Sequence, residues 1–576
     1  MQLPALFLVP DAVDMNTAKL MGRQSAGNGF LRGFVQHFEA TQTLPIVGFN
    51  KSTETAITGL LRDMGWRGPL AHFVASQPQQ WVGFDLLYYP APMGNQLAWQ
   101  RMRRGINAYA LCGVTHTISS SGAMRQIADY MREPFAPWDA LICTTPSVLR
   151  AVERIWEAEA DYLAWRFGTP ALASAATKPI MTPVIPLGVH CADYQAQAGT
   201  RDAVRQTWGV TEDDVVVLFV GRLSLHAKAN PLPMYVACQR AALQSGKRVR
   251  IVECGWFISD AMRDAFAQAA AQANVEVTFM DGRVSGAAKQ AYAGADMFVS
   301  LSDNIQETFG LTPVEAMAAG LPVVASDWDG YRDTIRHNVD GFLVPTCQPG
   351  HMADGDTLAH AYADEQISYD KYLAFSHVSV AVDVEATAQA IAQLAANPEL
   401  RQRMGASGRE RAAQVFDWRV VMAQYDELWR TQGELRRAGQ QHRLAQPTPA
   451  GKPQPSNARA LNPLDLFAHY ASFAIQPHTQ VSLSVPLQGK PTDEVNAHIA
   501  AMRGLGMWAM ANGWLAGADK LQQLVAPLVP AAQPGPDQNQ EVSLSVEQLG
   551  CAAGFSQASA QRALAWLAKV GLLRLQ

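Results

Sequence analysis

The sequence has few cysteines, almost no excess of charge and no long apolar run, and each shortage excludes a class of protein. Its 576 residues contain seven cysteines, an odd number with no Cys-x-x-Cys pair, so we expect neither a disulfide framework nor a zinc ribbon. The formal charge of −5 provides no overall attraction to nucleic acid or to an anionic membrane. No apolar stretch approaches the ~20 residues that a membrane-spanning helix requires.

What remains is the composition of a soluble protein with several domains. Hydrophobic residues make up 48% and charged residues 17% of the chain, as in ordinary globular proteins. The length exceeds what one hydrophobic core organises, so about two to four domains are expected. The first ten residues carry no basic leader, and spread free thiols suit a reducing compartment. We therefore expect a cytoplasmic protein, or one held peripherally at the inner face of a membrane.

Residues 215–344 alternate short apolar runs with segments of helical character. Continuous apolar strands separated by helices indicate a parallel sheet covered on both faces. The α/β pattern therefore predicts a doubly wound, Rossmann-like domain. Its expected strands are Val215–Val220, Val249–Cys254, Val275–Met280, Met297–Leu301, Pro322–Ser326 and Gly341–Val344.

The first 195 residues repeat this pattern with longer insertions. Two such domains would face a cleft, and ligands of open α/β sheets bind at the carboxyl ends of strands. We predict one α/β domain over 1–195 and a second over 196–415, with the chemistry between them. The expected strands of the first domain are Leu6–Val9, Ile46–Phe49, Gly83–Tyr89, Leu111–Val114, Ala140–Cys143 and Pro183–Leu187.

The end of the chain differs in composition from these domains. A closing helix is expected over 416–439, a Pro/Gln-rich linker over 440–460, and a helical domain over 461–576. The last part follows the order helix, Gly-containing turn, helix, strand, which is winged-helix-like. From Leu461 to Gln576 there are six Lys/Arg against seven Asp/Glu, a poor balance for phosphate contacts. Protein docking or dimerisation is the favoured role of this domain, and DNA binding is the alternative.

The segment Glu307–Glu315 combines an acid, a turn and a helix start. Thr312 is expected at the N-cap, Pro313 at the first helical position and Glu315 at the third, a capping box. Phe309–Leu311 would then present free backbone N–H groups, which attract phosphate. The residues alone leave two interpretations open. One is a site for a phosphorylated ligand, and the other is a capped helix with a solvated loop acid.

Other positions at the ends of predicted strands could reach the same ligand. Gly221–Arg222 and Lys228 follow the strand Val215–Val220, and two cations there suit a diphosphate. Gly22–Gly33 is a glycine-rich segment expected as a loop before a helix, and it lacks the dinucleotide pattern Gly-x-Gly-x-x-Gly. His116 follows a predicted strand on the cleft side, where a lone histidine is more often structural.

Glu307-x7-Glu315, with Asp329–Asp333 and Asp340–Val344 after it, resembles the signature of the family 4 retaining glycosyltransferases, which have the two-domain GT-B fold. The resemblance covers about residues 1–430, and it implies that 1–195 is the acceptor-side domain and 196–415 the nucleotide-sugar-binding domain. It implies that Glu307 and His116 lie near the donor sugar, that Glu315 binds the ribose, and that Arg222 and Lys228 neutralise the leaving diphosphate. The donor-binding residues that it implies are Gly27, Gly29, Gly221, Arg222, Lys228, Gly282, Arg283, Val284, Phe309, Gly310, Leu311, Thr312 and Glu315.

Two Asp-x-Asp segments, Asp327–Asp329 and Asp354–Asp356, match the metal-binding motif of the other main glycosyltransferase fold. The first follows a late strand and the second falls in a stretch expected to be irregular. Because lysine and arginine already supply countercharge, we predict no metal and no cofactor. Arg101–Arg104 is expected as a solvated face or as a contact for a polyanionic or lipid-phosphate acceptor.

We therefore predict a metal-independent enzyme that transfers a sugar from a nucleoside diphosphate to an acceptor hydroxyl, with retention. The acceptor could be a glycan, a lipid-linked sugar or a protein. A phosphorylase or sugar-nucleotide epimerase would keep the fold but change the reaction. A third hypothesis is a regulatory protein that senses a nucleotide sugar and binds DNA or protein through its carboxyl-terminal helix–turn–helix.

Overall fold

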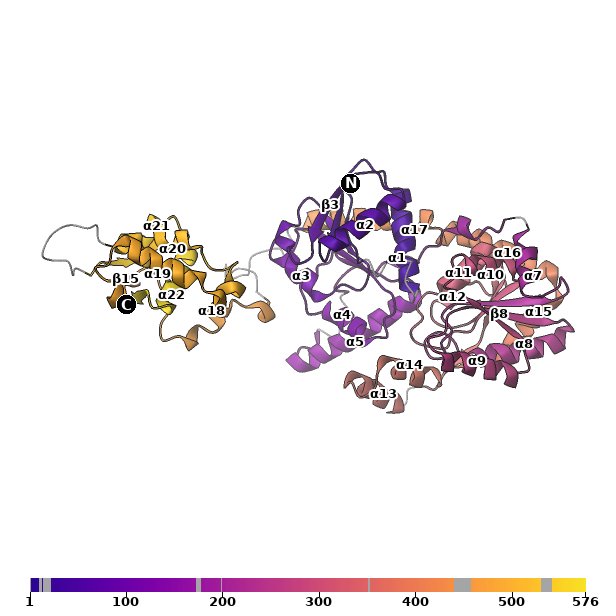
Figure 1. Ribbon diagram of the computed structural model, residues 1–576. Coiled ribbons are helices and arrows are strands. Elements are labelled where there is room, and N and C mark those ends of the chain that lie inside the picture. The colour runs from indigo at the N-terminus through magenta and orange to yellow at the C-terminus, as the bar shows by residue number, and fades with distance from the viewer. Residues whose placement is uncertain are drawn as a thin grey trace. The chain divides into compact units, whose positions relative to one another are not determined.

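The computed structural model of the protein describes residues 2–9, 13, 22–171, 178–197, 199–350, 353–439, 457–529 and 541–576. The chain divides into two compact units, Met1–Pro453 and Gln454–Gln576 (Figure 1). The larger unit contains two six-stranded parallel sheets with helices packed around them.

The first sheet has the strand order β3-β2-β1-β4-β5-β6, and the order reverses between β1 and β4. Leu70–Val74 was not predicted as a strand because its residues are only half-buried and His72 interrupts the apolar run. The expected strand Pro183–Leu187 is wrong, since this segment makes only an isolated bridge between Val184 and Cys143. The strands are β1 (Ala5–Phe7), β2 (Leu44–Gly48), β3 (Leu70–Val74), β4 (Leu86–Tyr89), β5 (Ala110–Val114) and β6 (Ala140–Ile142).

The second sheet has the order β12-β11-β10-β7-β8-β9, with its reversal between β7 and β10. All six strands expected here are present, and no end is shifted by more than two residues. The prediction of two doubly wound, Rossmann-like domains is confirmed. The strands are β7 (Val215–Val220), β8 (Val249–Gly255), β9 (Val277–Asp281), β10 (Met297–Ser300), β11 (Val323–Ser326) and β12 (Gly341–Val344).

Helices cover these sheets, and polar side chains cap many of their amino ends. Thr145, Asn230 and Ser259 each accept a backbone N–H of the first turn that follows them, which satisfies a donor without an intrahelical partner. The helices of the two domains are α1 (Gly22–His37), α2 (Lys51–Asp63), α3 (Asn95–Met102), α4 (Ser121–Asp129), α5 (Pro146–Phe167), α7 (Thr200–Thr207), α8 (Pro231–Ser245), α9 (Asp260–Gln272), α10 (Ala287–Gly294), α11 (Leu311–Ala319), α12 (Tyr331–Thr334), α15 (Val384–Ala396) and α16 (Pro398–Arg411).

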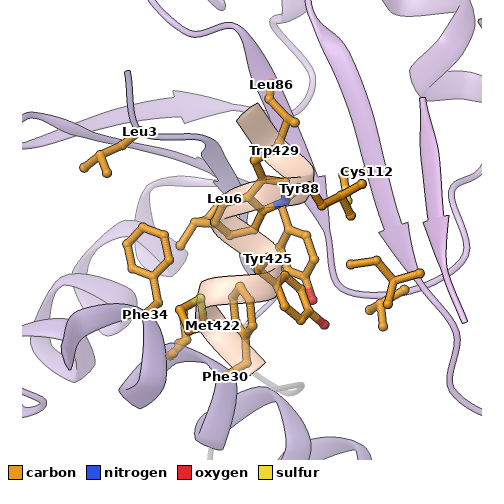
Figure 2. Close-up of a cluster of buried hydrophobic side chains, with 14 of the residues drawn as sticks. Leu3, Leu6, Phe30, Phe34, Leu86, Tyr88, Cys112, Met422, Tyr425 and Trp429 are labelled. Atoms are coloured by element: carbon orange, nitrogen blue, oxygen red, sulfur yellow. The ribbon is translucent and has the colours of Figure 1, made fainter. Parts of the chain in front are cut away.

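The helix α17 (Trp418–Ala438) follows the second domain in sequence but packs on the first, beside α1 (Figure 1). Figure 2 shows Met422, Tyr425 and Trp429 among side chains of the first domain, including Phe30 and Phe34. Trp429 and Tyr425 are almost completely buried, and burial of an aromatic side chain contributes ~1.5–3 kcal/mol. The core of the first domain is therefore completed by residues near the end of this unit.

The second domain also contains a long insertion after β12. The chain leaves at β13 (Thr346–Cys347), forms α13 (Ala353–Ala363) and α14 (Tyr369–His377), and returns at β14 (Ala381–Val382). The two short strands pair antiparallel. The expectation that Asp354–Asp356 lies in irregular chain is wrong, because both aspartates lie in the first turn of α13.

The smaller unit has a three-stranded antiparallel sheet in the order β16-β15-β17. The expected helix, turn, helix and strand are present as α21, a turn at Gly554, α22 and β17. No helix among the described residues of the chain combines the length and apolar character needed to cross a membrane. The elements are α18 (Pro463–Leu466), β15 (Gln480–Leu483), α19 (Thr492–Gly504), α20 (Ala518–Val525), β16 (Ser543–Ser545), α21 (Val546–Ala552), α22 (Gln557–Lys569) and β17 (Leu573–Leu575).

Candidate active site

The loops that follow β7 and β10 meet at the carboxyl edge of the second sheet, where these strands are neighbours. Lys228 Nζ lies 2.7 Å from Glu307 Oε2. The Arg222 guanidinium donates to Gln306 Oε1 at 3.0 Å. The structure therefore brings together the two cations and the first acid that the sequence singled out.

The ion pair of Glu307 and Lys228 is mostly shielded from solvent, with 13% and 34% of the side chains exposed. Burial pushes the pKa of Glu307 up. The Lys228 charge and hydrogen bond, together with backbone N–H groups of Thr308 and Gly310, outweigh burial and hold that pKa below its ordinary value. Glu307 is therefore an anion at neutral pH, and its carboxylate faces N–H groups of the kind that bind phosphate.

Arg222 is enclosed by the loop that carries it. Burial lowers the pKa of its guanidinium, and Asp370, Tyr369 and Glu307 act in the opposite direction. The loop begins at Gly221, which has φ = +156°, a conformation that glycine adopts at low cost. An arginine keeps its charge in such a site, so Arg222 provides a fixed cation beside Glu307.

The helix α11 begins at Leu311 and not at the expected position. Gly310 is its N-cap, with φ = +84° and no side-chain capping bond. A Cβ at Gly310 would lie 2.2 Å from the Tyr331 ring, so only glycine fits this turn. The expected capping box at Thr312 is wrong, because the tight packing of Gly310 on Tyr331 starts the helix earlier. The buried side chain of Phe309 packs edge-to-face on another ring of the core, and the first turn of α11 has no capping side chain.

Glu315 does not cap α11 as expected. Its carboxyl group instead contacts a tyrosine hydroxyl. The Tyr292 hydroxyl lies 3.0 Å from Glu315 Oε2 and 3.1 Å from the Thr312 carbonyl oxygen. Burial raises the pKa of Glu315, and hydrogen bonds from Tyr194 and Tyr292 oppose that rise. Two tyrosines therefore orient this carboxyl group on the first turns of α11.

The expected donor-binding residues Gly282–Val284 follow β9, which is separated from β7 by β8. Arg283 donates to Asp281 through Nε and Nη2, which lie 2.8 Å from Oδ1 and 2.7 Å from Oδ2. Gly282 lies so close to Gly255 that a Cβ would come within 2.9 Å of its Cα. Val284 is 62% exposed. The turn thus leaves backbone groups and an exposed apolar side chain for a ligand, while the arginine side chain is engaged.

The first domain contributes an apolar cavity with one imidazole. His116 Nε2 lies 3.0 Å from the Pro90 carbonyl oxygen, and His116, Gly27 and Trp418 line the same cavity. The expectation of a glycine-rich loop is wrong, because Gly27 and Gly29 both lie inside α1. A Cβ at Gly29 would lie 2.7 Å from Trp418 Nε1, so that glycine allows α1 and α17 to approach.

Comparison with known proteins agrees with this arrangement. Residues 200–367 match the model of the glycosyl transferases group 1 family.

Relatives carry the same description. A D-inositol 3-phosphate glycosyltransferase of Nocardia farcinica is 24% identical over 299 residues, which cover 49% of this chain and 60% of the relative. One from Geodermatophilus obscurus is 33% identical over 181 residues, covering 30% and 39%. The match thus spans less than two thirds of either relative.

A solved glycosyltransferase from Rickettsia africae has the same fold. It aligns with a TM-score of 0.50 and 12% identity over 75% of this chain and 98% of its own. The larger unit is therefore described as a GT-B fold, with the group 1 match on the domain that holds Arg222, Lys228 and Glu307.

The structure also places residues at the cleft that the sequence did not indicate. Thr145 Oγ1 donates to the Thr308 carbonyl oxygen at 3.1 Å. Ser147 donates to Asp333 Oδ2 through both its backbone N and its hydroxyl, at 3.0 and 2.8 Å. The start of α5 in the first domain is thus attached to loops of the second. The pattern Thr-Pro-Ser after a strand marks a helix start, but nothing in it indicates a contact between domains.

Possible metal-binding and polyanion-binding groups have other partners. The described residues contain no group of three or more His, Cys, Asp or Glu side chains placed to hold a metal ion. Asp327 pairs with Arg332 at 3.2 Å. The expectation of a basic surface at Arg101–Arg104 is wrong for Arg101, which is completely buried against Asp139.

Proposed function

We propose that the protein is a glycosyltransferase that moves a sugar from a nucleoside diphosphate to an acceptor hydroxyl with retention of configuration. The observation that carries this proposal is the meeting of Arg222, Lys228 and Glu307 with the uncapped start of α11 at one sheet edge. Fixed cations and helix N–H groups would stabilise the charge that develops on the leaving diphosphate.

Lys228 can serve both the resting and the bound state. Its ammonium group has three donors, so it can keep Glu307 while it binds a phosphate oxygen. The Glu307 carboxylate would then accept hydrogen bonds from the donor sugar. Glu315, oriented by Tyr292, would accept from the ribose hydroxyls, and the turn Gly282–Val284 would contact the base.

We propose that no metal ion or cofactor takes part. Arg222 and Lys228 supply countercharge that a divalent cation would otherwise provide. Activity of the full chain should therefore persist in excess EDTA, and its loss there would contradict this part of the proposal.

We propose that the acceptor binds on the side of the first domain, near His116. Printed names of relatives include D-inositol 3-phosphate glycosyltransferase and alpha-maltose-1-phosphate synthase, and we propose an acceptor rich in hydroxyl groups. A free glycan, a lipid-linked sugar or a glycoprotein all have this chemistry. The proposed location is cytoplasmic, either free or peripheral at a membrane.

We propose that the unit Gln454–Gln576 docks to a protein or dimerises. Arg562, one of two basic residues of α22, lies 4.3 Å from the centre of the Trp514 ring, which removes it from a phosphate-binding role. Apolar side chains of the unit are instead well exposed. Examples are Leu464, Tyr470 and Met507, with 74%, 75% and 73% of their surface exposed.

The test is a screen of UDP-, GDP- and ADP-sugars for protection of the full chain against thermal unfolding. A ligand at 100 times its dissociation constant adds about 2.7 kcal/mol to stability. We expect one nucleotide class to raise Tm and to release nucleoside diphosphate when hydroxyl acceptors are added. A chain that none of these donors stabilises would contradict the proposed function.

A further inference from the structure

The insertion between β13 and β14 forms a helical hairpin made of α13 and α14. Thr346 pairs with Val382 and Cys347 with Ala381, so the chain leaves and returns at one point of the second domain. Within the hairpin, the rings of Tyr362 and Tyr372 stack at 4.4 Å, with 11° between their planes. This stack joins α13 to α14.

Two tyrosine hydroxyls of the hairpin reach the first domain. The Tyr369 hydroxyl lies 2.7 Å from Ser119 Oγ and 3.4 Å from Thr117 Oγ1. The Tyr362 hydroxyl accepts the backbone N–H of Ser121 at 3.0 Å. Ser121 is the first residue of α4, and N–H groups of a first helical turn have no partner within the helix. Both bonds hold the segment that directly follows His116.

The start of α14 also approaches the loop of the two cations. Asp370 Oδ1 lies 3.8 Å from His226 Nε2, midway along the segment from Arg222 to Lys228. Tyr369 and Asp370 are close enough to Arg222 to oppose the effect of burial on the pKa of its guanidinium. The same two residues thus face the histidine side and the diphosphate side of the cleft.

We propose that Tyr369 is a positioning residue for sugar transfer, and that with Tyr362 it holds the segment after His116 against the diphosphate loop. This inference rests on the proposed function. By holding this segment, Tyr369 would favour transfer of the sugar to the acceptor over its transfer to water.

In transfer, the bond from the anomeric carbon to the diphosphate oxygen breaks. A bond to the acceptor oxygen forms, and the hydroxyl proton is released. In hydrolysis a water oxygen takes the acceptor's place, with the same balance of atoms. Closed domains exclude that water. Loss of one neutral hydrogen bond that favours the closed state should change its population about fivefold.

The test compares three variants of the full chain. Tyr369→Phe and Tyr362→Phe/Tyr369→Phe remove the hydroxyls and keep the rings. Tyr372→Phe is the matched control, because its ring stacks in the same hairpin and the described residues provide no hydrogen-bond partner for its hydroxyl. A second kind of variant replaces 348–380 by Asn-Gly, since a two-residue turn can close an antiparallel pair.

UDP-glucose, GDP-mannose and ADP-glucose serve in turn as probes. The readouts are release of nucleoside diphosphate without acceptor, transfer to a mixture of hydroxyl acceptors, and Tm. We expect the double variant to raise the ratio of hydrolysis to transfer at least about tenfold, with Tm and nucleotide-induced stabilisation unchanged. The excised variant should shift the ratio in the same direction, and Tyr372→Phe should match wild type.

An active wild-type enzyme whose double and excised variants keep the wild-type ratio would overturn the role of Tyr369 and leave the proposed function standing. A wild-type chain that neither hydrolyses nor transfers any of the three donors would overturn the proposed function, and this inference with it.

Discussion

The two Rossmann-like domains present different chemistry to the cleft between them. The second domain contributes charge, with Lys228 paired to Glu307 and Arg222 bonded to the neighbouring Gln306. The first contributes neutral groups, among them the hydroxyls of Thr145 and Ser147. The difference indicates a division of work. Under the proposed function, charge stabilisation belongs to the donor side, while hydrogen bonds from neutral hydroxyls join the two domains.

The largest expected effect on turnover comes from removing a cation of the second domain. Arg222→Ala should lower turnover by at least ~10²-fold, the scale of losing one donor to a developing anion. Steady-state kinetics with the donor found by screening measure this effect. Arg263→Ala, an exposed arginine on α9 of the same domain, is the matched control and should leave turnover unchanged.

A substitution in the first domain tests whether its hydroxyl groups matter less for turnover than the charges of the second domain. Ser147→Ala removes a hydroxyl whose single O–H can donate to the Asp333 carboxylate or to the Asp329 carbonyl oxygen. Turnover should fall by only about tenfold, the lower value of a hydrogen bond to a charged group. If Ser147→Ala were as damaging as Arg222→Ala, the contrast between the two sides would be lost.

A buried acid beneath the charged loop provides a pH-dependent test. Glu253 is 1% exposed and accepts the Tyr235 hydroxyl at 2.8 Å, and burial raises the pKa of its carboxyl from 4.5 to about 8. Between these values the unfolded chain loses a proton that the folded chain keeps. Stability therefore falls as pH rises through this window.

Glu253→Gln should remove that penalty. We expect a gain in the free energy of unfolding on the order of 2 kcal/mol at pH 8 and none near pH 4.5, measured by urea unfolding at both values. Glu385→Gln, on an exposed face of α15, should show no such dependence. A gain of equal size at both pH values would mean that Glu253 is ionised in the folded chain.

Gly29 tests packing in the first domain. Gly29→Ala would place a Cβ 2.7 Å from Trp418 Nε1 and should cost ~1–3 kcal/mol of stability. Gly59→Ala, in α2 with nothing within 4 Å of the added Cβ, should instead gain ~0.5–1 kcal/mol. Chemical unfolding of both variants measures the contrast. A Gly29→Ala protein of wild-type stability with a raised KM for the donor would restore the predicted phosphate-binding role.

The smallest effect is expected at Asp329, where the two domains meet. Its backbone has φ = +37°, Oδ1 accepts the Tyr331 N–H at 3.3 Å, and Oδ2 is buried with no hydrogen-bond partner among the described residues. Asp329→Gly should therefore raise stability by ~1 kcal/mol, detectable as a higher Tm. A lower Tm would mean that this carboxyl makes a stabilising contact in solution.

The second domain was the more predictable from sequence because its central strands are buried on both faces. The run Val215–Val220 is apolar throughout and completely buried, so its period and length identify it. The edge strand Leu70–Val74 carries no such signal, since its residues are half-buried and one is a histidine.

The residues of the candidate site also differ in how far the sequence predicts them. Arg222, Lys228 and Glu307 lie in loops directly after predictable strands, so their meeting follows from the parallel sheet. The glycines of α1 were misassigned to a loop because their partner, Trp418, lies far along the chain. Tyr369 could not be found for a similar reason, since its contact with Ser119 depends on how a helical hairpin packs across two domains.

The most direct test of the central claim is calorimetric titration of UDP, GDP and ADP into wild type and Lys228→Met. The account predicts that at least one nucleoside diphosphate binds wild type. It also predicts that binding weakens at least about tenfold in the variant, the value of a charge-assisted hydrogen bond. Equal affinity for both proteins, or no binding to either, would contradict a diphosphate site at Lys228 and Glu307.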